Sequence, residues 1–363
     1  MLKRTPFYDF HTSLGAKIVD FAGWEMPLLY RSIVDEHHHT RNSGGLFDVS
    51  HMGRLTFSGK DTLKFLDLVT SRDLKPTEVG QCKYALVCNE QGGTMDDVIV
   101  SRDVKQWNMV CNASNREKLV KHFQNIRRTR DLDFDMSDQT EATAMIALQG
   151  PKAIEKVSGI LPTDFTALKR WRFESSSYML IKFTVYRTGY TGEDGVELVL
   201  PAKMAGMAMK MIGGRFEKEN ATLKPAGLGA RDTLRIEAGL PLYGHELSEE
   251  IDPITAALGF AVSLDKDFIG ADALRARKPA RMLVGLELDG KRIARQGCLI
   301  VDKSGTVVGI VSSGTMSPTL NKSIAMAFVD VGHTAVGTEL AADLSGTHHP
   351  CKVVPLPFYK RAK

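Results

Sequence analysis

The segment Tyr186-Arg-Thr-Gly-Tyr-Thr-Gly-Glu-Asp-Gly-Val-Glu197 places three glycines and three acidic residues between two apolar stretches. Glycine tolerates backbone conformations and close contacts that other residues resist. The pattern therefore predicts a strand, a tight loop and a second strand. A carboxylate beside such a loop can accept two parallel N–H bonds from a planar ligand. An ordinary acidic turn carries the same residue types, so both interpretations stay open at this point.

Helix and strand patterns surround this segment. Residues 60–127 predict a helix, three strands and a second helix, which would begin at the capping box Ser114-Asn-Arg-Glu117 and end near residue 124. The three strands are expected at 84–88, 97–101 and 107–111. Further helices are expected after Ser32, after Gly150-Pro151 and at 230–238, and further strands at 45–51 and 143–148.

The C-terminal part of the chain has a different pattern. Short apolar runs separated by turns predict strands without helices between them, so residues 280–363 are expected to form a separate all-β domain. The runs are 282–288, 298–301, 307–312, 324–329 and 353–356. With the mixed helices and strands before it, this predicts an α+β fold.

Length, charge and cysteine content limit the function classes. The 363 residues exceed one ordinary core, so two or three domains are expected. A net charge of +4 without a concentrated patch argues against a nucleic-acid partner, but is compatible with an anionic ligand or an acidic partner. Short apolar stretches and the lack of a signal region predict no membrane association and a cytoplasmic location. Five cysteines without a CxxC pair disfavour disulfides and structural zinc.

Two adjacent carboxylates end the segment Gly92-Gly-Thr-Met-Asp-Asp97. Neighbouring side chains on a strand point to opposite faces, so Asp96 and Asp97 cannot share one proton as a catalytic pair. Composition alone favours two solvated acids at the end of a hairpin. The functional alternative is that one of them faces a cavity and exchanges a proton with a ligand nitrogen.

Other candidate groups each have a structural alternative. Arg231, in Gly227-Leu-Gly-Ala-Arg-Asp232, would lie in the first turn of a helix, where it could bind an anion or form a surface salt bridge. Glu36-His-His-His39 has a spacing seen in metal-binding helices, but no second copy exists, so a solvated helix face is favoured and no metal is expected. His51 follows Ser50, yet no nucleophile elbow supports a catalytic pair. Met204, Met207 and Met211 recur at helical spacing and are expected in the core.

A set of motifs runs in order from near residue 4 to near residue 359. They are Arg4-Thr-Pro6, Phe21-Ala-Gly-Trp-Glu-Met-Pro27, Leu46-Phe-Asp-Val-Ser-His-Met-Gly53, Gly92-Gly-Thr-Met-Asp-Asp97, Leu148-Gln-Gly-Pro151, Arg187-Thr-Gly-Tyr-Thr-Gly-Glu-Asp-Gly195, Gly227-Leu-Gly-Ala-Arg-Asp232, Tyr243-Gly244, and Ser317-Pro-Thr319 followed by Ser323-Ile-Ala325. Together they resemble the aminomethyltransferase family, the T-protein family of the glycine cleavage system. The set is far more specific than any one motif.

The resemblance implies a reaction and a fold. Members of the family transfer the one-carbon unit of an aminomethyl group, carried on the lipoyl arm of H-protein, to tetrahydrofolate. Ammonia, 5,10-methylenetetrahydrofolate and dihydrolipoyl H-protein are the products of this step in glycine catabolism, and no metal is needed. The implied fold has three domains around a central folate cavity. They are a discontinuous folate-binding domain at 1–50 and 140–245, an α/β domain at 51–139, a connecting segment at 246–279, and a barrel-like all-β domain at 280–363.

The resemblance also assigns residues. Asp97 takes the position of the catalytic carboxylate, near the folate nitrogens that receive the carbon. Glu197 takes that of the acid that binds the pterin, and Arg231 that of an arginine close to the ligand. Tyr84, Asn112 and Tyr190 stand where folate contacts are expected. Leu240 and Arg170 stand where some relatives place tyrosines, which changes the aromatic lining of the cavity.

Two other functions are compatible with parts of this pattern. One is a folate-dependent demethylase of the same superfamily, against which the complete segment 187–195 and the acids at 96–97 argue. The other is a folate-binding protein without transferase activity, related to proteins of iron–sulfur assembly. Those relatives carry a cysteine in a Lys-Gly-Cys-Tyr setting, and no cysteine of this chain lies in that context.

Overall fold

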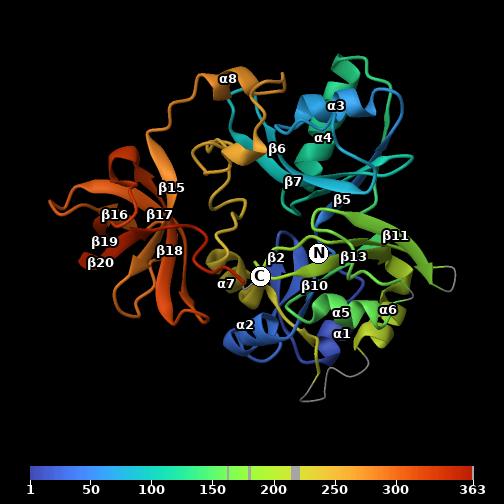
Figure 1. The fold of residues 1–363 in the computed structure, drawn as a ribbon, viewed down its shortest axis with the longest axis horizontal. Helices are drawn as coiled ribbons and strands as arrows, with labels where there is room; N and C mark the ends of the chain where they lie inside the picture. The colour runs from blue at the N-terminus through green and yellow to red at the C-terminus, as the bar shows by residue number, and fades with distance from the viewer. Residues whose placement is uncertain (162, 179–180, 214–220, 362–363) are drawn as a thin grey trace. The chain divides into compact units, whose positions relative to one another are not determined.

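Two compact units make up the chain in the computed structural model, which describes residues 1–161, 163–178, 181–213 and 221–361 (Figure 1). The first unit comprises Met1–Phe65, Leu74–Lys83 and Val98–Asp232, and the second comprises Leu66–Asp73, Tyr84–Asp97 and Thr233–Lys363. Both units are discontinuous because the chain passes between them several times. The expected division into three domains, with boundaries at 50, 139, 245 and 279, stays a prediction.

A six-stranded sheet organises the first unit, in the order β11-β12-β13-β10-β4-β14. Its strands are β4 (Gly45–Asp48), β10 (Thr143–Gln149), β11 (Phe173–Tyr178), β12 (Ile181–Tyr186), β13 (Gly195–Pro201) and β14 (Lys224–Pro225). All neighbours are antiparallel except β14, which runs parallel to β4. The strand, loop and strand predicted for 186–197 are confirmed by the end of β12, the loop at 187–194 and the start of β13.

Short helices and a small sheet complete this part of the first unit. They are β1 (Lys3–Arg4), β2 (Lys17–Phe21), β3 (Trp24–Leu29), α1 (Tyr8–Ser13), α2 (Ile33–Asn42), α5 (Ala153–Ser158), η1 (Ala202–Met204) and α6 (Ala205–Gly213). The side chain of Ser32 accepts the backbone N–H of Asp35 at 3.3 Å, which confirms the predicted cap of α2. One apolar core, including Phe7, Leu148 and Phe183, packs behind the large sheet.

A five-stranded sheet has the order β6-β7-β8-β5-β9, and β6 and β7 each carry residues of both units. The elements are β5 (Gly53–Ser58), α3 (Thr62–Val69), β6 (Gln81–Cys88), β7 (Thr94–Arg102), β8 (Trp107–Cys111), α4 (Arg116–Thr129) and β9 (Asp135–Asp138). The predicted order of a helix, three strands and a helix is confirmed. The capping box is wrong, because the N-cap of α4 is Asn115, whose side chain makes no capping hydrogen bond, and the helix extends to Thr129.

The predicted all-β domain is a closed barrel in the order β15-β18-β17-β16-β19-β20. Its strands are β15 (Arg281–Leu288), β16 (Leu299–Val301), β17 (Val307–Ser317), β18 (Lys322–Asp330), β19 (Glu339–Leu344) and β20 (Thr347–Val354), with η3 (Val331–His333) after β18. Sequence reasoning missed β19 because two alanines and two acids are poor strand formers. Its leucines and Ala342 nevertheless alternate inward, into the barrel core.

The segment before the barrel is mostly irregular. It contains the end of α7 (Leu228–Glu237), η2 (Gly259–Ala261) and α8 (Ala271–Arg275). Its apolar side chains, among them Leu247, Ala256 and Phe268, pack with Leu86 and Cys88 of β6 in a core of the second unit. Within the described ranges, no helix combines the length and the apolar character needed to cross a membrane.

Candidate functional site

Glu197 lies in the middle of the large sheet of the first unit. It is on β13, paired with Tyr186 of β12 on one side and with Ala147 of β10 on the other. The residue is 6% exposed, and its carboxylate accepts a hydrogen bond from the hydroxyl of Thr188. A carboxylate has acceptor sites for about four donors. Since Thr188 is its only hydrogen-bonding partner among the described residues, Glu197 retains acceptor capacity for a ligand.

The other two acids of this segment are engaged in ion pairs. Glu193 accepts from Arg41 at 2.9 Å, with both side chains 4% exposed, and the same guanidinium nitrogen donates to the carbonyl of Thr191 at 2.7 Å. Asp194 accepts two bonds from Arg187, at 2.8 and 3.3 Å. Both pairs hold the loop in place. Glu197 is therefore the acid of the segment that is best placed to bind a ligand.

The glycines of the loop have a packing role that the sequence pattern did not reveal. A Cβ atom on Gly189 would lie 1.8 Å from Oε1 of Gln149, and one on Gly195 would lie 2.3 Å from the carbonyl oxygen of Leu148. The amide of Gln149 donates to the carbonyl oxygens of Thr188 and Val196. The atoms that approach these glycines closely therefore belong to the protein itself, at the end of β10.

Arg231 lies at the start of α7, in the first unit. Its backbone N–H donates to the carbonyl of Gly227 at 3.1 Å, and its guanidinium lies 4.9 Å from the ring centre of Tyr190. The Nη1 atom is buried and has no hydrogen-bond partner among the described residues. Burial lowers the pKa of Arg231, while the charges of Glu197 and Tyr190 raise it. Arg231 forms no ion pair within the described chain, so the surface salt bridge is wrong.

His51 is a second buried group without a partner in the first unit. It is 3% exposed, its ring lies edge-on to Phe21 with centres 5.5 Å apart, and its Nδ1 has no described partner. Burial lowers its pKa to about 4, Asp48 acts in the opposite direction, and Arg231 and Arg54 lower it further. The imidazole is therefore neutral at physiological pH.

Ser50 does not form a catalytic pair with His51. Its hydroxyl donates to the carbonyl of Met145 at 3.1 Å and accepts the N–H of the same residue at 3.0 Å. Asp48 is likewise used internally, because it accepts from Thr5 at 2.6 Å and is hydrogen-bonded to His11 at 2.9 Å. These contacts fix the end of β4, and His51 lies three residues after that end.

Asp97 and Tyr84 meet in the second unit. The hydroxyl of Tyr84 donates to Oδ2 of Asp97 at 3.1 Å, and its ring stacks on Phe260 with centres 6.2 Å apart. Asp97 is half-buried, whereas Asp96 is fully buried. The prediction that the two side chains face opposite ways on a strand agrees with this difference. The favoured interpretation of two solvated acids is wrong for Asp96.

The remaining predicted site residue is Asn112, in the first unit. Asn112 directly follows β8, whose last residue Cys111 pairs with Gly53, and its carbonyl accepts the N–H of Asn115 at 3.1 Å. It is half-buried. The first unit thus brings Glu197 and Tyr190 together with Arg231. Sequence reasoning missed Phe260, because a single aromatic in an irregular segment has no periodic pattern.

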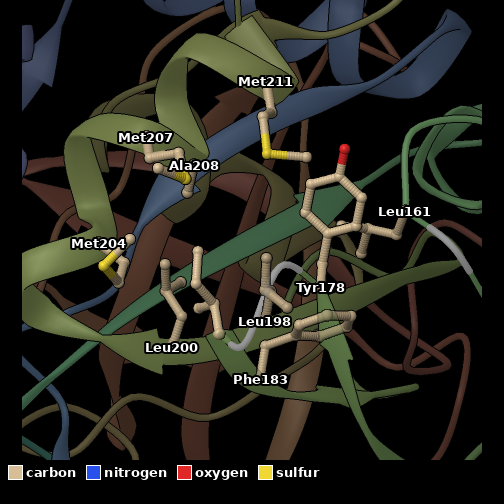
Figure 2. Close-up of a pocket in the computed structure, with 10 residues that line it drawn as sticks. Leu161, Tyr178, Phe183, Leu198, Leu200, Met204, Met207, Ala208 and Met211 are labelled. Carbon is tan, nitrogen blue, oxygen red and sulfur yellow. The ribbon is translucent and has the colours of Figure 1, made fainter.

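An apolar pocket in the first unit lacks the chemistry of a polar site. Met204, Met207 and Met211 border it on one side, and strand residues such as Leu198 and Leu200 border it on the other (Figure 2). The methionines were expected in the core, and Met207 is instead 43% exposed. The lining carries no charged side chain. It therefore offers no carboxylate to accept the adjacent donors of a pterin.

The helix carrying Glu36-His-His-His39 is not a solvated face. Glu36 is 7% exposed and His37 is fully buried, so that expectation is wrong. Among the described residues, no group of three His, Cys, Asp or Glu side chains has an arrangement suited to a metal ion.

Comparisons with known proteins cover the whole chain. Residues 7–266 match the family described as "GCVT N-terminal domain", and residues 281–360 match the "Glycine cleavage T-protein C-terminal barrel domain". A protein of Rubrobacter xylanophilus named "Aminomethyltransferase" is 46% identical over 368 residues, which cover 100% of this chain and 95% of the relative. The "Aminomethyltransferase" of Geobacillus kaustophilus is 41% identical over 370 residues, with 100% of each chain covered.

The fold comparison agrees with the sequence comparison. The solved structure of glycine cleavage system aminomethyltransferase T from Bartonella henselae has a TM-score of 0.91 with this chain, at 33% identity. It covers 99% of both chains. The barrel that was expected from the short apolar runs at 280–363 is therefore part of a shared architecture.

Proposed function

Because the chain belongs to the aminomethyltransferase family, that of the glycine cleavage T-protein, we propose that it transfers a one-carbon unit from an aminomethylated lipoyl carrier to tetrahydrofolate. The carrier is the lipoylated H-protein of the glycine cleavage system. The observation that supports folate binding most directly is Glu197, a buried carboxylate in the sheet to which one threonine hydroxyl donates among the described residues.

The proposed reaction moves one carbon and two protons. The carbon leaves the lipoyl sulfur and the amino nitrogen, and forms bonds to N5 and N10 of tetrahydrofolate. The two hydrogens on those nitrogens are lost as protons. One proton reaches the amino group, which leaves as ammonia, and the other reaches the sulfur, which becomes the thiol of dihydrolipoyl H-protein. A group that stabilises developing positive charge on nitrogen and accepts a proton assists this sequence.

Glu197 and Arg231 would bind the folate by directional bonds. The aminopyrimidinone edge of a pterin offers adjacent N–H donors, which a carboxylate accepts in a parallel pair. The buried Nη1 of Arg231 is a donor and would reach an acceptor on the ligand. Tyr190, against which the guanidinium packs, would keep that group in place. Asn112 is proposed as a further folate contact.

Asp97 would be the catalytic carboxylate. The hydroxyl of Tyr84, which donates to Oδ2, orients this half-buried carboxylate toward the folate nitrogens in the proposal. A hydrogen bond to a carboxylate favours its ionised form, which is the form that stabilises an ammonium-like intermediate. Tyr84 would contact the folate as well as orient Asp97.

The reaction as proposed requires no metal and no other cofactor. We assign it to the cytoplasm, which accords with five cysteines, all within the described residues, that form no disulfide. Activity should therefore persist after exhaustive chelation. Loss of activity on chelation, with recovery on addition of a metal, would contradict this part of the proposal.

The decisive experiment mixes the purified protein with aminomethyl-loaded H-protein and tetrahydrofolate. We expect methylenetetrahydrofolate and ammonia in equal amounts, and tetrahydrofolate alone should raise the melting temperature because it binds the folded state. Folate binding without product would indicate a binding protein. Product formed only from a methylated amine, thioether or ether would indicate a demethylase.

A further inference from the structure

Glu36 is a buried acid that the proposed reaction does not use. It lies on α2 and its carboxylate accepts three backbone N–H groups. Oε1 accepts from Tyr30 at 2.7 Å and from Arg31 at 3.0 Å, and Oε2 accepts from Gly227 at 2.8 Å. The first two donors directly precede α2. The third lies 191 residues away along the chain, at the entry to α7.

Gly227 connects Glu36 to Arg231 through two backbone hydrogen bonds. Its N–H is held by Glu36, and its carbonyl accepts the N–H of Arg231 at 3.1 Å. Both backbone polar groups of Gly227 are thus fixed, one by the acid and the other by the first turn of α7.

The packing around this turn leaves little freedom. A Cβ atom on Gly227 would lie 2.3 Å from the carbonyl oxygen of Leu28, and one on Gly229 would lie 2.6 Å from Cδ1 of Ile33. The start of α7 therefore rests directly on the segment that leads into α2. Glu36 supplies the directional part of that contact, because charge-assisted bonds are shorter and stronger than neutral ones.

The proposed ligand contact of Arg231 depends on the orientation of its guanidinium. Its Nη1 is buried and has no described partner, and its guanidinium lies over Tyr190. A planar guanidinium recognises acceptors in a fixed geometry, so a small rotation of α7 would misplace the donor. We propose that Glu36 is a positioning residue, which fixes the first turn of α7 through the Gly227 amide and so aims Arg231 at its ligand. The inference rests on the proposed function in that Arg231 contacts the folate.

A double-mutant cycle on tetrahydrofolate affinity tests this chain of contacts. Glu36→Gln keeps the shape but presents an NH2 group to backbone donors, and should weaken folate binding by about tenfold with a smaller change in kcat. Arg231→Ala should weaken binding as well. If Glu36 acts through Arg231, the double variant binds no more weakly than Arg231→Ala alone. Effects that add, or an unchanged affinity of Glu36→Gln, would overturn the proposal.

A matched control separates positioning from general stability. Ser32→Ala removes the N-cap of the same helix without touching Gly227. It should lower the melting temperature but leave folate affinity unchanged, and an equal loss of affinity in this variant would overturn the proposal. Should Glu36→Gln not fold, Glu36→Asp takes its place in the cycle, since it retracts the charge from Gly227.

Binding of tetrahydrofolate by the wild-type protein distinguishes a failure of the role of Glu36 from a failure of the proposed function. No binding of tetrahydrofolate by the unmodified chain would remove the proposed function and this inference with it. Normal wild-type binding, together with additive losses in the cycle, would remove the role of Glu36 and leave the proposed function standing.

Discussion

The segment 186–197 and the strand β7 both present neighbouring acids, and they differ in how one acid is made available to a ligand. In the segment 186–197, the loop acids Glu193 and Asp194 pair with arginines, whereas Glu197 on β13 accepts one hydroxyl donor from the described residues. In the strand, Asp96 is fully buried and Asp97 half-buried, as alternation requires. Ion pairing with arginines thus determines which acid is available to a ligand in the segment 186–197, whereas the alternation of side chains determines it in β7.

This difference determines what each region loses on mutation. An acid selected by backbone geometry cannot be replaced by its neighbour, because the neighbour points away. An acid selected by partner choice has neighbours that could be freed if their arginines were removed. Substitution of the available acid in β7 should therefore abolish its function. Substitution of the available acid in the segment 186–197 should reduce its function in part.

The largest expected effect is on Asp97. Asp97→Asn preserves volume but removes a base and a negative charge, so it should fold, bind folate and lose turnover by roughly 10²–10⁴-fold. Asp96→Asn should instead lower the melting temperature, because Asp96 is fully buried, while the folded fraction keeps most of its turnover. Turnover and melting temperature should be measured on both variants. Near-normal turnover of Asp97→Asn, or an inactive but well-folded Asp96→Asn, would reverse the assignment.

The contrast between the regions also explains what could be predicted from the sequence. The alternation that separates Asp96 from Asp97 is a property of any strand and needed no structure. The order of elements in 60–127 and the all-β character of 280–363 followed from the same local periodicities. The resemblance to a family, and not the spacing, then selected Asp97 and Glu197 as the functional acids.

The rest depends on contacts between distant residues. Arg41 lies 152 residues from Glu193, so no local pattern shows that Glu193 is already paired. Glu36 was expected on a solvated helix face because its metal-like spacing has no second copy, yet it is 7% exposed and accepts three backbone N–H groups. A surface salt bridge was one of two alternatives for Arg231, yet its Nη1 is buried and has no hydrogen-bond partner among the described residues. Such pairings are fixed only when the chain has folded.

The next largest effect should be on the stability of the loop. Glu193→Gln breaks the ion pair with Arg41, in which both side chains are 4% exposed, and should cost about 3–5 kcal/mol of unfolding free energy. Asp194→Asn breaks a pair whose side chains are 19% and 24% exposed, and should cost about 1 kcal/mol. Urea denaturation of both variants measures the difference. Equal costs would show that partner burial does not distinguish the two acids.

The pH dependence of stability tests the interior near Arg231. Burial lowers the pKa of His51 to about 4, from 6.5. Between these values the unfolded chain binds a proton that the folded chain does not. His51 should therefore contribute a loss of stability as the pH falls through 6.5, which reaches roughly 3 kcal/mol near pH 4.

The variant His51→Asn isolates this contribution. It should flatten the decline in unfolding free energy between pH 6.5 and pH 4, because the titrating group is absent. His348→Asn, on an exposed histidine, should leave the slope unchanged. If the slope of His51→Asn equals that of the wild type, His51 is not held neutral in the fold.

The smallest effect is the most specific for the loop. Glu197→Gln keeps the shape of the side chain but turns one acceptor into a donor that faces the donors of a pterin. Loss of such a charge-assisted pair should weaken tetrahydrofolate binding by about 1.5–3 kcal/mol, with a smaller change in turnover at saturation. Calorimetry should be run beside Asp194→Asn, whose carboxylate is already engaged by Arg187. Because Asp194 already pairs with Arg187, the variant Asp194→Asn should bind folate normally. Unchanged affinity in Glu197→Gln, with a loss of affinity in Asp194→Asn, would move the pterin contact from Glu197 to Asp194. It would also show that pairing with an arginine does not decide which acid binds the ligand.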